Sequence, residues 1–210
     1  MNLMQICTKI RENFDSKNLA REKALSFSRQ AIIASSNAIR AIHRGELREA
    51  EKLLAEVREA LDKAENLLKE HKDIYYAGFF QDAQKEYAEA MITLALIHGE
   101  PLPVPDEIGV GYPQFLNGLG EAIGELRRHI LDIIREGDLK RGEELLKVMD
   151  DLYYVLVSFD YPEAITCGLR RTTDIARSVI QKTRGDLTTA LRQSELQKSI
   201  ARLEERLKKK

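Results

Sequence analysis

The clearest pattern along the chain is a stretch in which polar positions give way to apolar ones on every side. Residues 84–97 contain no glycine or proline and are predicted to form a helix. From 90 to 97 only Thr93 is polar, which is typical of a buried helix. Glu86 and Glu89 precede this part and, being three apart, share one face. Burying a carboxylate is costly unless it is paired or bound to a cation, so this acidic pair is the first candidate for chemistry.

The remaining pattern is also helical, and no segment alternates as a strand would. Glycine followed by an acid and leucine recurs at Gly45, Gly137 and Gly185, and each copy predicts a turn between helices. A short helical repeat would also explain the recurrence, but the helices are too long for the common ones. The prolines within 101–113 predict the one long loop. The predicted helices are residues 1–13, 16–43, 46–71, 73–98, 115–136, 138–158, 162–184 and 187–207.

These elements predict an all-α fold, a single-domain bundle of about seven helices spanning residues 1–210. The length of 210 residues suits one domain, and 32% charged residues favour long helices. Cys7 and Cys167 lie far apart and form no disulfide or zinc pattern, so both are expected to be ordinary buried thiols. No signal peptide is present and no apolar run approaches the ~20 residues of a membrane span, which predicts a cytoplasmic protein without a membrane partner.

A second acidic pair follows the proline-rich loop. Glu121 and Glu125 are four residues apart, on one face of the helix predicted over 115–136. They lie beside the apolar stripe of this helix and next to three glycines, and glycine inside a helix costs about 1 kcal/mol relative to alanine. The glycines therefore predict close approach of another backbone or room for a ligand. They are Gly118, Gly120 and Gly124, and the predicted core stripe beside them is Phe115, Leu119, Ala122, Ile123, Leu126, Ile130 and Ile133.

The two acidic pairs have a simple interpretation as glutamates on solvated helix faces. The more specific hypothesis is that Glu86, Glu89, Glu121 and Glu125 face one another. Two carboxylates ~4 Å apart repel by about 4 kcal/mol at an effective dielectric near 20, so four of them need protons or a cation. Oxygen-only ligands favour Mg²⁺, or else Mn²⁺. A di-iron bundle is disfavoured because it needs Glu-x-x-His on two helices, whereas Glu125 and His129 are four apart.

The net charge is only −1, so any electrostatic signal is local. Residues 23–45 contain no acid in a chain that has 34 of them. Such a strip can follow a phosphate backbone, although it can equally be a solvated or intersubunit face. Basic residues within roughly half the circumference of the helix that contains this region, with two more from the segment after residue 168, are the predicted RNA contacts: Lys17, Arg21, Arg29, Arg40, Arg44, Arg170 and Arg171.

Several segments taken together resemble the translin/Trax family. Residues 86–90, Glu-Tyr-Ala-Glu-Ala, resemble a Glu-Tyr-Val-Glu-Ala segment of the Trax branch, and residues 119–126 resemble its Asp-Leu-Thr-Gly-Glu-Leu segment. Residues 168–185 resemble the family's C-terminal helix, and 21–22 and 75–76 also look like translin positions. The resemblance covers nearly the whole chain and depends on the order and spacing of these segments.

The resemblance implies a seven-helix subunit of a closed, hollow oligomer with RNA inside. The Trax branch usually works beside translin, but with one chain in hand we expect self-association into a homo-oligomer that binds single- or double-stranded RNA. The Trax branch cleaves RNA with Mg²⁺ held by acids. Glu86, Glu89 and Glu125 match those acids, while Glu121 stands where the branch has an aspartate. We therefore expect a Mg²⁺-dependent endoribonuclease in which the four glutamates are both metal ligands and catalytic residues. The alternatives are a non-catalytic translin-like oligomer that binds RNA or single-stranded DNA, and a helical scaffold with no nucleic-acid role.

Overall fold

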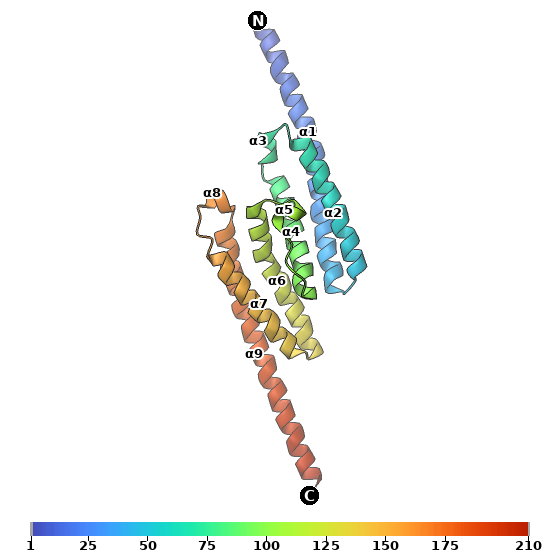
Figure 1. Ribbon diagram of the computed structural model, residues 1–210, viewed down its shortest axis with the longest axis vertical. Coiled ribbons are helices and arrows are strands. Elements are labelled where there is room, and N and C mark those ends of the chain that lie inside the picture. Colours follow the sequence, from blue (N-terminus) through green and yellow to red (C-terminus); the bar gives the residue numbers. More distant parts are fainter. Residues whose placement is uncertain (1, 210) are drawn as a thin grey trace. The chain divides into compact units, whose positions relative to one another are not determined.

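The computed structural model describes residues 2–209, which form helices joined by turns and loops, with no strand among them (Figure 1). The all-α prediction is therefore confirmed. The described helices are α1 (Leu3–His43), α2 (Leu47–Leu68), α3 (Lys72–Tyr75), α4 (Phe79–His98), α5 (Pro105–Ile108), α6 (Tyr112–Glu136), α7 (Leu139–Val157), α8 (Glu163–Thr166) and α9 (Leu169–Lys208).

Contacts divide the chain into two compact units, Met1–Leu119 and Gly120–Lys210, with the boundary inside α6. In the first unit, α1 packs along α2 and against α4 (Figure 1). Much of the α1 face that meets them is made of small residues spaced three or four apart, which allows neighbouring helices to approach closely. These buried residues are Ala20, Ala24, Ser28, Ala31, Ser35 and Ala38. The single-domain organisation expected from the sequence stays a prediction.

In the second unit, α7 packs along α9. Gly142 of α7 shows how closely the helices meet, because a Cβ there would lie 3.1 Å from Leu187 Cδ1 of α9 and 3.8 Å from Ile130 Cγ2 of α6. The predicted α6 stripe forms much of this core. Leu126 and Ile130 are fully buried, whereas Phe115 is only half-buried.

The predicted helix break near residues 13–16 is wrong. Asp15 and Ser16 lie within α1, which begins at a capping box formed by Asn2 and Gln5 and continues without interruption. Both residues are exposed in α1. A residue that can cap a helix is tolerated inside one when its side chain faces water, and without glycine or proline nothing here stops the helix.

The break predicted at Gly185 is also wrong. Gly45 and Gly137 do end helices, at φ +72° and +89°, but Gly185 lies within α9, which continues to Lys208. An exposed helical glycine costs about 1 kcal/mol, which the flanking turns of a 40-residue helix can offset. Here Thr189 Oγ1 donates to the Gly185 carbonyl oxygen at 3.0 Å.

Other boundaries also differ. The helix predicted over 162–184 is divided, because α8 ends at Thr166 and α9 begins at Leu169. The helix predicted from residue 73 is two helices, α3 and α4, because Gly78 takes φ +100° between them. Two prolines sit at helix starts: Pro105 begins α5, and Pro113 lies in the first turn of α6, where a missing N–H costs nothing.

The cysteines are not buried thiols, since Cys7 is half-buried and Cys167 is exposed. Among the described residues, no helix combines the length and apolarity needed to cross a bilayer.

Candidate metal and RNA site

The first acidic pair stands on α4 where the helix enters the core. Tyr87 and Ala88, between the two acids, are buried, and none of residues 90–97 is exposed, so the prediction of a buried helix is confirmed. Glu86 and Glu89 themselves are half-buried. Lys85 Nζ lies 3.7 Å from Glu86 Oε1, with the two side chains 26% and 29% exposed. The pair is therefore partly withdrawn from water, with a lysine beside Glu86.

The beginning of α6 packs directly against this part of α4, within the first unit. A Cβ added to Gly118 would lie 2.9 Å from both Ala88 Cβ and the Glu89 backbone nitrogen, and 3.0 Å from the Lys85 carbonyl oxygen. These distances leave no room for any side chain. The sequence prediction that the α6 glycines mark close approach is confirmed at Gly118.

The other two α6 glycines behave differently from each other. In the second unit, a Cβ at Gly120 would collide with the Thr172 methyl group of α9, so this glycine also marks a close approach. A Cβ at Gly124 would meet nothing within 4 Å, and the residue is exposed. Gly124 therefore lies on an open side of α6.

The second acidic pair lies on α6 beside its buried stripe. Glu121 and Glu125 are half-buried, and each is followed directly by a buried residue, Ala122 and Leu126 respectively. Arg128 Nη1 lies 3.9 Å from Glu125 Oε2, and the arginine is the more exposed partner, at 55% against 24%. Neither pair is a fully solvated row of glutamates, so the simple interpretation of both as solvated faces does not hold.

Carboxylates supply only oxygen ligands, and half-buried carboxylates suit a hard cation such as Mg²⁺ or Mn²⁺. The nearby tyrosine is a weak candidate for proton transfer, because burial raises the pKa of Tyr87 above its usual value. Arg58 opposes this rise and Asp62 adds to it, both by smaller effects. Its hydroxyl stays protonated at neutral pH.

The predicted RNA contacts of α1 fall into two groups. Lys17, Arg21 and Arg44 already have acidic partners: Lys17 Nζ donates to Asp73 Oδ2 at 2.6 Å, Arg44 Nη2 donates to Glu46 Oε2 at 2.6 Å, and Arg21 pairs with Glu22. The hydrogen bond from Lys17 lowers the pKa of Asp73, which keeps that pair ionised.

Arg29 and Arg40 form the second group. Both are exposed, and neither makes an ion pair with another described residue. Arg40 only donates to Asn37 Oδ1, at 3.2 Å. Ile33, 62% exposed, lies between them on the same face of α1. This face therefore carries two cations that are available to an anionic ligand.

The remaining predicted contacts, Arg170 and Arg171, are exposed in the first turn of α9, in the second unit. The turn starts at Gly168, which has φ +96°. Sequence reasoning missed a hollow farther along this helix, where Tyr153 and Tyr154 of α7 lie beside Arg177 and Arg184 of α9. The signal for it was weak, because its residues come from two helices and form no contiguous motif.

Comparison with known proteins finds relatives along almost the whole chain. An uncharacterised protein of Methanocaldococcus jannaschii is 29% identical over 191 residues, which cover 90% of this chain and 84% of that protein. No family model matches the chain.

Solved structures are also similar. The crystal structure of AfC3PO is 33% identical, with a TM-score of 0.79, and the similarity covers 94% of this chain and 98% of that one. AfC3PO has also been solved in a complex with duplex RNA, which matches at 32% identity, a TM-score of 0.76 and the same coverage of both chains. Apo-NeC3PO, 20% identical with a TM-score of 0.79 over 88% of this chain and 96% of that one, shares the fold.

Proposed function

Because the chain belongs to the translin/C3PO family, we propose that it binds RNA and cleaves it as a Mg²⁺-dependent endoribonuclease. The observation that supports RNA binding most directly is the match to AfC3PO, a protein solved with duplex RNA, over 94% of this chain. Exposed cations on α1, Arg29 and Arg40 above all, are suited to contact phosphates.

The proposal of catalysis depends on the two acidic pairs acting together. Gly118 places the first turns of α6 against α4 at Glu89. Glu121 and Glu125 follow Gly118 by three and seven residues, and these spacings bring residues of a continuous helix to one face. Helical periodicity thus supports the proposal that both α6 acids point toward the face of α4 that carries Glu86 and Glu89.

In the proposed mechanism, Glu86, Glu89, Glu121 and Glu125 hold a Mg²⁺ ion, with Mn²⁺ as a substitute. When bound, the ion polarises a phosphate and lowers the pKa of a bound water. The carboxylates bind the ion and orient the attacking water, and one of them accepts its proton. The arginines of α1 and the start of α9 bind the RNA backbone, which leaves sequence choice to other contacts.

We further propose that the protein acts as a closed homo-oligomer, as its family likeness implies. The exposed apolar residues at the start of α1, such as Leu3 and Phe14, are consistent with burial against another copy. Light scattering of the purified protein gives the subunit number directly. A monomer at micromolar concentration would contradict this part of the proposal.

The test is RNA cleavage with Mg²⁺, with excess EDTA, and with Glu89→Gln, which removes the charge and keeps the side-chain size. We expect EDTA to stop cleavage and Glu89→Gln to slow it by about 100-fold or more, because even outer-shell partners of a metal contribute 10–100-fold. Glu100→Gln, in the exposed segment after α4, is the matched control and should cleave normally.

RNA binding should survive in Glu89→Gln, since the α1 cations are unchanged. Cleavage that persists in EDTA, or a fully active Glu89→Gln variant, would contradict the nuclease proposal. Salt-sensitive RNA binding without cleavage by the unmodified protein would favour the non-catalytic oligomer instead.

A further inference from the structure

A shallow hollow opens on the second unit between α7 and α9, apart from the acidic pairs and the α1 cations. Its volume is about 470 Å³. Six of its lining residues carry the argument, and we call this feature the tyrosine hollow: Tyr153, Tyr154, Arg177, Ile180, Gln181 and Arg184. It combines rings, an apolar floor and hydrogen-bond donors in one small area.

The rings and the floor suit a flat, partly apolar ligand. The Tyr153 and Tyr154 ring centroids are 6.0 Å apart and the ring planes are inclined by 59°. Tyr154 is 72% exposed, while Ile180 is 4% exposed. An aromatic ring that stands beside an apolar surface and still faces water offers a stacking surface for another ring.

The charges around the hollow suit an anion. Arg177 and Arg184 are seven residues apart on α9 and so lie on one side of the helix, about 10 Å apart along its axis. Arg184 Nη2 donates to both Asp150 carboxylate oxygens at 2.7 Å, which fixes its position. Arg177 is exposed and makes no ion pair with a described residue.

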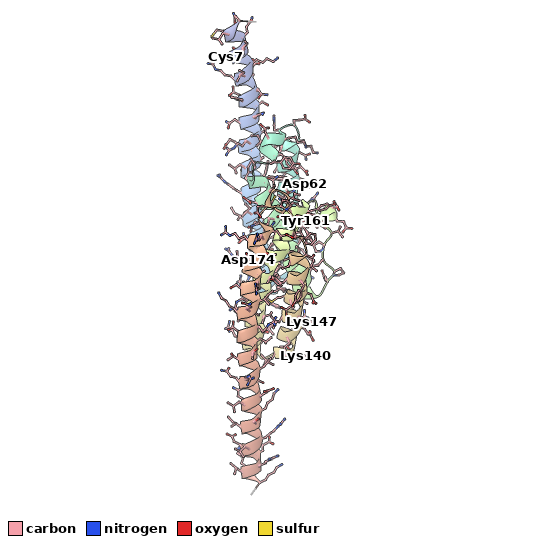
Figure 2. All side chains as sticks on the ribbon, turned by 90° about the vertical axis from the view of Figure 1, so that its left-hand side faces the viewer. Cys7, Asp62, Lys140, Lys147, Tyr161 and Asp174 are labelled. Atoms are coloured by element: carbon pink, nitrogen blue, oxygen red, sulfur yellow. The ribbon has the colours of Figure 1, made fainter. Side chains whose placement is uncertain are left out.

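Both helices that line the hollow, α9 and α7, carry further cations beyond it. On α9, Arg170 lies seven residues before Arg177. On α7, Lys147 lies seven residues before Tyr154, and Figure 2 shows Lys147 and Lys140 along that helix. Both lysines are exposed. A chain of phosphates passing the hollow would therefore meet cations on either side of it.

We propose that the tyrosine hollow binds one unstacked nucleobase of single-stranded RNA. The base stacks on the ring of Tyr154. Gln181 and Arg177 donate hydrogen bonds to its edge, and Lys147 lies near a flanking phosphate. Arg184, held by Asp150, borders the hollow. This inference rests on the proposed function, because it takes RNA as the ligand. A base within a duplex is stacked on both faces and paired along its Watson–Crick edge, so it cannot enter, and the hollow distinguishes single strands from duplexes.

Tyrosine and arginine are also enriched where proteins meet proteins. The lining of the tyrosine hollow favours RNA, because it has two arginines against one aspartate, Asp150, and that aspartate already binds Arg184. A second copy of this chain on the same face is the competing outcome that the experiment separates.

The experiment compares the affinity for a short fluorescent polyuridine strand with that for a blunt duplex RNA, by anisotropy at constant salt. Metal is left out so that no strand is cleaved. Tyr154→Ala should weaken binding of the single strand by about 5- to 140-fold, the loss of one stacked base, and leave duplex binding unchanged. Tyr154→Phe, which keeps the ring, should restore the affinity. Tyr76→Ala is the matched control, since Tyr76 is 71% exposed and lies in the other unit.

Equal losses for the single strand and the duplex, no loss at all, or failure of Tyr154→Phe to restore binding would overturn the inference. So would a change in subunit number, measured by light scattering, with unaltered RNA affinity, since the face would then bind another copy. If the unmodified protein bound neither the single strand nor the duplex, the proposed function would fail together with this inference. If it bound RNA and only the Tyr154 results differed from those expected, the inference alone would fail.

Discussion

The acids of α4 and α6 and the cations of α1 differ in how far their charged side chains are buried. Glu86, Glu89, Glu121 and Glu125 are half-buried beside fully buried neighbours. Arg29 and Arg40 are exposed and cost the fold little. Partial burial makes it unfavourable to keep an acid ionised, and Lys85 and Arg128 offset part of that cost at Glu86 and Glu125. A cation bound by the acids is our proposal. Exposure of arginines is common and points to a ligand only through other observations.

The largest effect should come from the α6 acids. Glu121→Gln removes one charge from the proposed ion site and should slow RNA cleavage by about 100-fold, a loss of about 2.7 kcal/mol of transition-state stabilisation. Glu121→Asp should retain most of the activity, because an aspartate stands at this position in the catalytic branch that the sequence resembles. Initial rates under saturating Mg²⁺ measure both variants. A fully active Glu121→Gln would remove α6 from the site.

Helix packing beside the acids gives the next effect. Gly118→Ala places a Cβ 2.9 Å from Ala88 Cβ and should destabilise the protein by about 1–3 kcal/mol, the usual cost of overpacking. Gly124→Ala, in the same helix with nothing within 4 Å, should stabilise it by about 0.5–1 kcal/mol. Urea unfolding followed by circular dichroism measures both, and equal effects from the two substitutions would contradict the close approach of α4 and α6.

The cations should show a smaller and graded effect. Replacing Arg29 and Arg40 together by alanine should weaken RNA binding by about tenfold and reduce the dependence of affinity on salt. Replacing Lys17 and Arg44 should have less effect, because Asp73 and Glu46 already partner them. Titrations at two salt concentrations compare the double variants. An equal loss in both would mean that the existing ion pairs do not matter for RNA.

Much of the fold could be predicted from local chemistry. Gly45, Gly99 and Gly137 end helices at positive φ, a conformation that other residues rarely adopt, so the sequence predicts these ends well. Asp15, Ser16 and Gly185 were predicted to interrupt helices and do not. A capping residue or a glycine allows a helix to end but does not require it. Whether α1 and α9 continue past such a residue depends on the stability of the helix on both sides of it.

The candidate site was also predictable only as far as local sequence spacing reaches. Spacings of three and four residues place each acidic pair on one helix face, and the glycines of α6 predicted the contact at Gly118. That all four acids share one ion remains a proposal, because periodicity fixes faces within a helix and says little about separate helices. The tyrosine hollow was not predicted, because Tyr154 and Arg177 come from different helices and form no motif in the sequence.

One measurement tests the central claim most directly: titration of Mn²⁺ followed by electron paramagnetic resonance, with Mg²⁺ as competitor. The unmodified protein should bind Mn²⁺ at a site from which Mg²⁺ displaces it, and Glu89→Gln and Glu121→Gln should each abolish that binding while remaining folded. If either variant kept the site intact, α4 and α6 would not share an ion, and the proposed nuclease centre would be contradicted.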